Sequence, residues 1–111
     1  MLNLFQRKPA GFVNVTSDEL HTLMHQKSRF ELVDVRSQGE YARGHLKGAK
    51  LIPLPELASR AGQLDPEKVT ILYCASGSRS QRAARFLAEQ GFGDVRNLQG
   101  GIARWGGEVV R

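Results

Sequence analysis

The mostly apolar run that ends at Cys74 constrains the fold more than any other feature of the sequence. Val69–Tyr73 predicts a buried strand, and Cys74 follows it as the only cysteine of the 111-residue chain. A short polar loop comes next, and residues 79–90 then have the pattern of an amphipathic helix that Gly91 ends. The thiol is therefore expected at the carboxyl end of a strand and beside a helix N-terminus, where ligands collect in open α/β sheets.

Predicted strands alternate with predicted helices along the whole chain. The other strands are expected at residues 12–15, 30–35 and 95–98, with a brief strand at 49–53. One further helix is expected to begin at a Thr16–Glu19 capping box and to run to about Lys27. Shorter helices are expected at 36–43 and 56–62, with a final helical turn near Trp105. This alternation favours an α/β fold in which helices cover both faces of a central parallel sheet of about five short strands. We expect residues 1–12 to form an N-terminal arm and residues 13–111 a single domain.

The charge and the cysteine count restrict the partners and the compartment. The net charge is +5, but the cations are scattered without a basic run, so we expect small anions and no nucleic acid as partners. A single cysteine cannot form an internal disulfide, which suits the cytoplasm. There is neither a secretory signal nor an apolar run long enough to span a bilayer, so no stable membrane insertion is expected.

The loop after Cys74 is suited to holding a thiolate. A free cysteine with a pKa near 8.5 is only about 3% ionised at neutral pH, and a helix N-terminus and a nearby arginine stabilise the charged form. Gly77 allows backbone N–H groups to converge, Ser76, Ser78 and Ser80 add hydroxyls, and Arg79 adds a planar cation. We therefore expect a reactive thiol that is open to solvent at the edge of the core. The alternative is a buried cysteine that acts as a small apolar residue.

Four motifs, in the same order as in the family, resemble those of single-domain rhodanese sulfurtransferases over about residues 13–105. They are Asp34-Val35-Arg36 with Glu40-Tyr41, Gly44-His45-Leu46-Lys47-Gly48-Ala49 with Ile52-Pro53, Tyr73-Cys74-Ala75-Ser76-Gly77-Ser78-Arg79-Ser80, and Leu98-Gln99-Gly100-Gly101 with Trp105. Each motif alone is weak, but four in order form a specific match.

The resemblance implies a rhodanese-like fold and a sulfurtransferase. By it, Cys74 takes a sulfane sulfur from a donor such as thiosulfate, becomes a persulfide, and passes the sulfur to an acceptor such as cyanide or a protein thiol. Cys74 and Arg79 would be catalytic, and no metal or organic cofactor is implied. The remaining loop residues would hold the terminal sulfur: Ala75, Ser76, Gly77, Ser78 and Ser80.

Two alternatives stay open beside this reading. One is a relay module that hands a Cys74 persulfide to a partner protein, and the other is a thiol phosphatase or arsenate reductase on the same fold. Only four residues separate Cys74 from Arg79, whereas the related phosphatases have five, which favours sulfur transfer. Thiosulfate-preferring members often have a cation directly after the cysteine, and Ala75 stands there instead. Arg82, one helical turn beyond Arg79, is a further candidate for attracting an anionic donor, and Arg85 continues the row.

Several other polar residues are candidates for supporting roles. Asp34, Arg36 and Glu40 follow a predicted strand and are expected to form an ion pair in the wall of the site. His21 and His25 have a spacing that can bind zinc, but no third ligand accompanies them, and a solvent-facing pair is favoured. His45 is a weak candidate for a general base, because flanking glycines indicate a tight turn.

Overall fold

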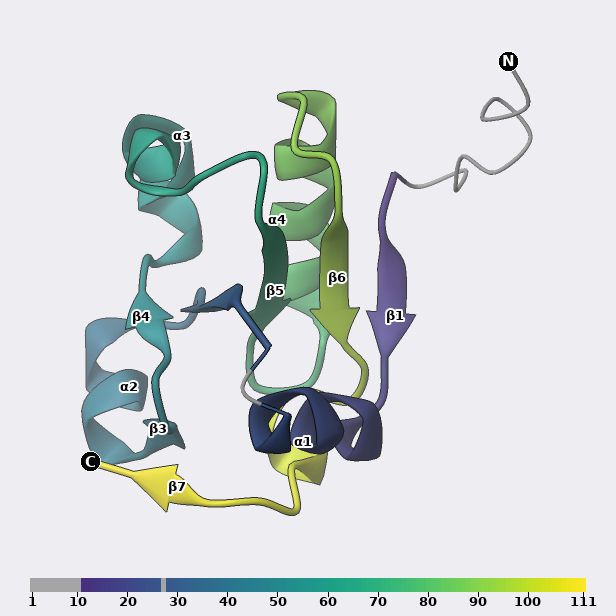
Figure 1. Ribbon diagram of the computed structural model, residues 1–111. Helices are drawn as coiled ribbons and strands as arrows, with labels where there is room; N and C mark the ends of the chain where they lie inside the picture. The colour runs from purple at the N-terminus through teal and green to yellow at the C-terminus, as the bar shows by residue number, and fades with distance from the viewer. Residues whose placement is uncertain (1–10, 27) are drawn as a thin grey trace.

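Five parallel strands form the central sheet in the order β1-β6-β5-β2-β4 (Figure 1). The computed structural model describes residues 11–26 and 28–111, and every structural statement below concerns those residues. The five strands are β1 (Val13–Val15), β2 (Phe30–Asp34), β4 (Lys50–Leu51), β5 (Val69–Tyr73) and β6 (Val95–Leu98). The predicted parallel sheet of about five short strands is therefore confirmed.

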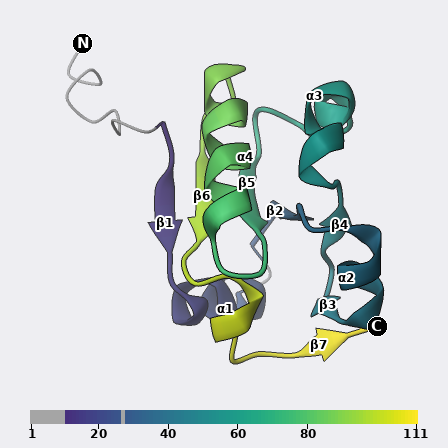
Figure 2. The same ribbon diagram turned by 180° about the vertical axis from the view of Figure 1, so that it is seen from behind.

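Helices cover both faces of this sheet. Figure 2 shows α4 in front of β5 and β6, whereas α1 lies on the face that is nearer in Figure 1. The helices are α1 (Ser17–His25), α2 (Gln38–Arg43), α3 (Leu57–Arg60) and α4 (Ser78–Glu89), with short 3-10 turns η2 (Leu54–Glu56), η3 (Ala61–Gln63) and η4 (Ile102–Arg104). The predicted α/β class is confirmed.

Alternate residues of β5, continuing into Cys74 directly after it, enter two separate hydrophobic cores. Leu72 and Cys74 belong to the core under α3 and α4, while Ile71 and Tyr73 belong to the core under α1. This alternation follows from the two-residue period of a strand. It puts Cys74 on the same side of the sheet as α4, the helix that its own loop begins.

The helix starts follow from the sequence. Thr16 Oγ1 accepts from Glu19 N at 3.1 Å while Glu19 Oε1 accepts from Thr16 N at 2.8 Å, so the predicted capping box is formed. Ser37 and Glu40 make the same pair of bonds at the start of α2. In contrast, α4 has no side-chain cap, and Gly77 precedes it with φ at +112°.

Some element boundaries differ from the sequence expectation. The helix expected at 79–90 is Ser78–Glu89, followed by Gly91 at φ +96° as predicted. The single helix expected at 56–62 is divided into η2, α3 and η3. Helix α1 ends at His25, and Lys27, where it was expected to end, lies outside the described residues.

A second, two-stranded sheet was not predicted. β3 (His45–Leu46) pairs antiparallel with β7 (Val109–Val110), which brings the last strand of the chain against the segment after α2. Of the predicted N-terminal arm, residues 1–10 lie outside the described part, and Phe12 packs on the α4 core with the Arg85 guanidinium 5.8 Å from its ring. In the described residues, no helix has the length and apolar character needed to cross a bilayer.

Candidate active site

The sulfur of Cys74 is surrounded by hydrogen-bond donors from the start of α4. Gly77 N lies 3.1 Å from Sγ, Ser80 N 3.3 Å and Ser80 Oγ 3.4 Å. Ser80 N belongs to the first turn of α4 and Gly77 N to the residue just before it, and the free N–H groups and dipole of this helix end favour a negative charge. The left-handed backbone of Gly77 turns the chain so that its own N–H points at the sulfur.

These contacts decide the ionisation of the thiol. Burial by itself would raise the pKa of Cys74, because a charged sulfur loses its hydration. The hydroxyl of Ser80 and the backbone N–H groups of Ser80, Gly77 and Ser76 outweigh that effect, so the pKa is lowered from its ordinary value. The predicted stabilisation of the thiolate is therefore supported, with Ser80 as its strongest donor.

The expectation of a solvent-open thiol was wrong. Cys74 is only 1% exposed, and Gly77 and Ser80, which donate to its sulfur, are buried too. The sequence placed Cys74 correctly at the edge of the core but gave no sign that the loop folds back over it. Ala75 is half-buried, and Ser76 and Ser78 are exposed on the outside of the loop.

The backbone of the cysteine loop is held from the other side by η4. Ile102 N donates to Cys74 O at 2.9 Å, and Ala103 N donates to Ala75 O at 3.0 Å. Gly101 lies so close that a Cβ there would be 2.5 Å from Cys74 O. The glycine pair of the fourth sequence motif therefore allows η4 to support the loop, a role that the sequence did not reveal.

Arg79 is engaged with Glu40 of α2. Arg79 Nη1 donates to Glu40 Oε1 at 2.8 Å and Nη2 donates to Oε2 at 3.0 Å, a bidentate pair that joins α4 to α2. The hydrogen bonds from Arg79, together with those from Ser37, lower the pKa of Glu40 to about 2. Arg79, which the sequence predicts as a cation beside the thiolate, donates these hydrogen bonds to Glu40 and not to the sulfur, and its charge acts on Cys74 through space.

Asp34 and Arg36 form the predicted ion pair, but on the other side of the sheet. Arg36 Nη2 donates to Asp34 Oδ2 at 2.7 Å and to Gly44 O at 2.6 Å, and both side chains are buried. Val33 and Val35, the strand neighbours of Asp34, belong to the α4 core, so Asp34 points away from it. The pair holds the turn after α2, while Glu40, expected to join it, pairs with Arg79 instead.

The arginines along α4 differ in their surroundings. Arg82 is exposed one turn beyond Arg79, as a donor-attracting residue requires, and Arg85 lies over the Phe12 ring at 5.8 Å. The contact of Arg85 with an aromatic face gives it a packing role. Arg82 stays a candidate for attracting an anionic donor.

Sequence reasoning missed Asn97. Its Oδ1 lies 2.5 Å from Ser80 Oγ, and its Nδ2 donates to Asn14 Oδ1 at 3.0 Å. Asn97 is 1% exposed, on β6 beside β5. A polar residue inside the short predicted strand 95–98 was the available signal, because buried amides require partners.

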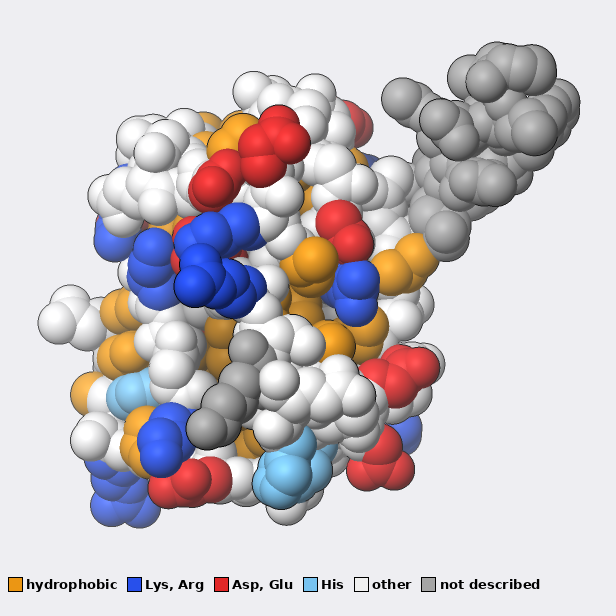
Figure 3. Space-filling model, viewed as in Figure 1, with side chains coloured by type: hydrophobic (Ala, Val, Ile, Leu, Met, Phe, Trp, Pro, Cys, Tyr) orange, Lys and Arg blue, Asp and Glu red, His pale blue; other side chains and the backbone are white. Residues whose placement is uncertain are grey.

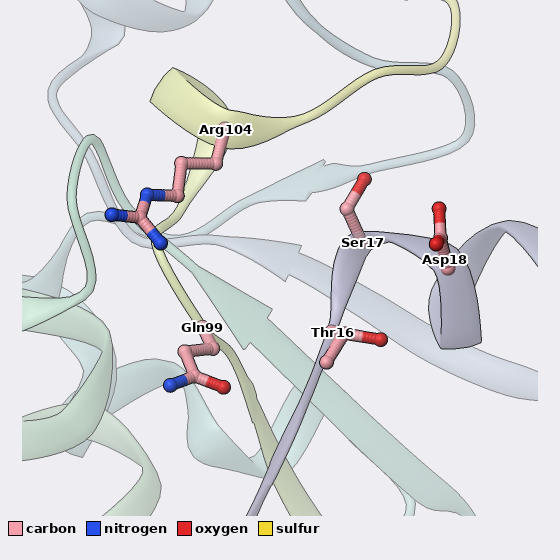
Figure 4. A pocket seen from close by; sticks show the side chains of 5 residues that line it. All are labelled: Thr16, Ser17, Asp18, Gln99 and Arg104. Atoms are coloured by element: carbon pink, nitrogen blue, oxygen red, sulfur yellow. The ribbon is translucent and has the colours of Figure 1, made fainter.

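A surface pocket of about 210 Å³ opens where β1 and β6 end. Thr16, Ser17, Asp18, Gln99 and Arg104 line it, and Figure 4 shows the Arg104 side chain extending away from Ser17 and Asp18. Arg104 belongs to η4, the turn that supports the cysteine loop, so the pocket adjoins the candidate site without containing the sulfur.

The histidines lie apart from the sulfur. His21 and His25 are exposed on α1 with ring centroids 5.1 Å apart, and Figure 3 shows histidine side chains at the surface over α1. Among residues 11–26 and 28–111, no group of three or more His, Cys, Asp or Glu side chains is placed to hold a metal. His45 stacks on Tyr41 at 3.7 Å with Nδ1 2.9 Å from Tyr41 O, so its contacts are those of a structural residue.

On the face in Figure 3, blue cationic and red anionic side chains are interspersed.

The fold and the cysteine loop define a class of protein. The rhodanese-like domain family matches residues 16–108, and the chain belongs to that family. The crystal structure of a rhodanese-like domain protein from Staphylococcus aureus superposes with a TM-score of 0.81 at 31% identity, covering 87% of this chain and 94% of that one. The predicted family and rhodanese-like fold are thereby confirmed.

Among curated proteins, two relatives are informative. The chain is 34% identical over 96 residues to the thiosulfate sulfurtransferase GlpE of Shewanella oneidensis, which covers 86% of this chain and 94% of GlpE. It is 40% identical over 79 residues to the uncharacterized protein YqhL of Bacillus subtilis, covering 71% of this chain. That match spans 63% of YqhL, less than two thirds of its length.

Proposed function

We propose that this protein is a sulfurtransferase that moves a sulfane sulfur from a donor to a nucleophilic acceptor through a persulfide on Cys74. The observation that carries the proposal is the set of three donors around Cys74 Sγ, two backbone N–H groups and one hydroxyl within 3.4 Å. Membership of the rhodanese-like family and similarity to a protein named as a thiosulfate sulfurtransferase support it.

The proposed reaction has two balanced steps. The Cys74 thiolate attacks the sulfane sulfur of thiosulfate, the sulfur–sulfur bond of the donor breaks, and sulfite leaves with the electron pair. Cyanide then attacks the outer sulfur of the persulfide, thiocyanate leaves, and the thiolate is restored. The donors that stabilise the thiolate would also stabilise the negative outer sulfur, and ping-pong kinetics are expected.

Two features bear on the choice of donor. Ala75 supplies no cation beside the nucleophile, and the Nη1 and Nη2 atoms of Arg79 already donate to Glu40. Arg82 is then the nearest exposed cation on α4 in sequence. Replacing Arg82 by Gln is expected to reduce the salt dependence of kcat/KM for thiosulfate, because it removes part of the attraction for a dianion. An unchanged salt slope would exclude this role.

The occupied arginine also weighs against phosphate chemistry. A phosphatase on this fold needs its loop arginine to grip the phosphate, and here that guanidinium already makes two hydrogen bonds with a carboxylate. The loop is also one residue shorter than in the related phosphatases, with four residues between Cys74 and Arg79. Sulfur transfer therefore agrees better with the site than phosphoester hydrolysis.

Intact-mass measurement after incubation with thiosulfate tests the proposal. The wild-type protein is expected to gain one sulfur atom, and cyanide is expected to remove it. Cys74→Ser is the control, which is expected to keep its fold and gain nothing. No gain by the wild-type protein, or a gain by the serine variant, would contradict the proposal, and phosphoester hydrolysis instead would favour the phosphatase alternative. Loading with negligible turnover would point to the persulfide relay.

A further inference from the structure

A chain of polar side chains runs from the sulfur of Cys74 to the surface at β1. Ser80 Oγ lies 3.4 Å from Sγ and 2.5 Å from Asn97 Oδ1, and Asn97 Nδ2 donates to Asn14 Oδ1 at 3.0 Å. Ser80 is 0% and Asn97 1% exposed, while Asn14 reaches solvent. Helix α4, β6 and β1 each supply one link, and Asn14 and Asn97 are direct register partners.

The hydroxyl proton of Ser80 has three acceptors in reach. Gly77 O is 3.2 Å away, in addition to Asn97 Oδ1 and Cys74 Sγ. A hydroxyl has one proton, so it cannot satisfy all three at once. While Cys74 holds its own proton, the short contact gives the Ser80 proton to Asn97. Once the sulfur is a thiolate, it can only accept hydrogen bonds, and the Ser80 hydroxyl then donates its hydrogen bond to the sulfur.

The Asn97 side chain can serve both arrangements. Its amide has an acceptor oxygen and a donor nitrogen that a half turn of the group interchanges. With the oxygen toward Ser80 it accepts from the hydroxyl, and with the nitrogen toward Ser80 it donates to the hydroxyl oxygen and leaves the proton for sulfur. Exposed Asn14 can turn in the same way, so Asn97 keeps two hydrogen bonds in either state.

We propose that Asn97 is a positioning residue: it holds the Ser80 hydroxyl against Cys74 Sγ and reverses the direction of its hydrogen bond when the thiol ionises. The inference rests on the proposed function in taking the thiolate as the reactive form. The charged group that interacts with the sulfur is Arg79 of α4, which is paired with Glu40 of α2. Asp34, Arg36 and Tyr73, from β2 and β5, form their own cluster across the sheet.

The test measures the pKa of Cys74 from the pH dependence of its alkylation by iodoacetamide. Asn97→Leu, which keeps the volume and removes both polar atoms, is expected to raise that pKa by about one unit and to slow alkylation near pH 7 up to about tenfold. Ser80→Ala is expected to raise the pKa by at least as much. In the Ser80→Ala protein, Asn97→Leu should add nothing, because its action passes through the hydroxyl.

Thr70→Val is the matched control. Thr70 is buried on β5 and hydrogen-bonds to Lys68 O, so its loss removes a buried polar group without touching the chain to the sulfur. The Cys74 pKa is expected to stay at the wild-type value in this variant. The proposal is overturned if Asn97→Leu leaves the pKa unchanged, or shifts it equally with and without the Ser80 hydroxyl.

A second variant guards against misfolding. If circular dichroism shows that Asn97→Leu is unfolded, Asn97→Asp is used instead. Its side chain has the same shape as asparagine, but a carboxylate can only accept hydrogen bonds, so the Ser80 hydroxyl keeps donating to it and not to the sulfur. The shift in the Cys74 pKa that Asn97→Asp causes should then be larger with Ser80 present than in the Ser80→Ala protein, and equal shifts would overturn the proposal. Alkylation does not involve sulfur transfer, so the result stands whether or not the protein takes sulfur from thiosulfate.

Discussion

Arg79 and Glu40 meet through two parallel hydrogen bonds of 2.8 and 3.0 Å at the junction of α4 and α2. The side chains are 37% and 25% exposed, so water screens the attraction and the pair contributes about 1 kcal/mol or less to folding. Its main effect is geometric, because it fixes the guanidinium direction beside the cysteine loop and ties the start of α4 to the segment that follows β2.

Glu40→Gln should reveal this pair through acid sensitivity. The pKa of Glu40 is lowered to about 2, so its contribution is fully present above the ordinary value of 4.5 and is lost as the pH falls through 2. The wild-type protein should exceed the variant by about 1 kcal/mol in urea unfolding at pH 7, and the difference should shrink below pH 4.5. Glu56→Gln, which breaks the exposed pair with Arg60, is the control for losing a carboxylate. A difference independent of pH would contradict the assignment.

The burial of Cys74 predicts selectivity by reagent size. Because the residue is 1% exposed, iodoacetamide should react much faster with it than the bulky aromatic disulfide DTNB, relative to their rates with a small free thiol. The measurement compares both rates in native protein and in guanidinium chloride, where the loop no longer covers the sulfur. Equal relative rates in the native protein would mean that the loop opens freely.

The role of single residues was predictable only where their partners are close in sequence. The loop contains Cys74 and the hydrogen-bond donors to its sulfur within seven residues, so one motif showed them together. Glu40 lies 39 positions from Arg79, and Asn97 lies 17 from Ser80. Those partners depend on how strands and helices assemble, which side-chain type alone does not specify.

At the scale of elements, close backbone contact between η4 and the cysteine loop requires glycine. Gly101 has φ at +61°, and a Cβ there would lie 2.5 Å from Cys74 O and 2.6 Å from Ala75 O. Gly91, after α4, also has a positive φ of +96° but has open space around it. The two positions therefore separate the effect of backbone strain from that of a collision.

Gly101→Ala should destabilise the protein more than Gly91→Ala. Strain alone is expected to cost about 1 kcal/mol at Gly91, whereas at Gly101 the clash with two carbonyl oxygens should add about 2 kcal/mol or more and displace the loop. Gly62→Ala, with an ordinary φ and open space, is the neutral control. Denaturant unfolding gives the free energies, and similar values for Gly101→Ala and Gly91→Ala would show that η4 moves aside without penalty.

Elements with local signals were predicted well, and those without them were not. The capping residues Thr16 and Ser37 marked the starts of α1 and α2, and the apolar run marked β5. Strands β3 and β7 have two residues each, too few to show a period, and they pair across more than sixty positions. The turns around α3 lack a side-chain cap, so their division into three parts had no sequence signal.

At the scale of the whole molecule, the central sheet separates two hydrophobic cores that contain different polar groups. The core under α3 and α4 contains Cys74, whereas the core under α1 contains Tyr73, whose hydroxyl accepts from Leu46 N at 3.0 Å. Burial raises the pKa of Tyr73, so this hydroxyl stays protonated. Strand β7 lies beside β3, where the chain ends (Figure 1).

Removal of residues 108–111 should lower the free energy of unfolding without changing the pKa of Cys74. The deletion removes the β3–β7 pairing and the carbonyl of Glu108 that accepts from Trp105 Nε1. We expect a loss of about 1–2 kcal/mol in the free energy of unfolding, since a few hydrogen bonds disappear. The Cys74 pKa from alkylation should match the full chain. A shift in that pKa would show that the β3–β7 pairing and the cysteine loop are coupled.

The anchoring of Cys74 O and Ala75 O by Ile102 N and Ala103 N has a consequence for synthesis. A ribosome adds Ile102 and Ala103 28 residues after Cys74 and Ala75, and at roughly 5–20 residues per second that delay lasts seconds. During that interval the carbonyl groups of Cys74 and Ala75 lack the partners that anchor them in the folded protein. The backbone of the cysteine loop is therefore fully anchored only after β6 and η4 have emerged and docked.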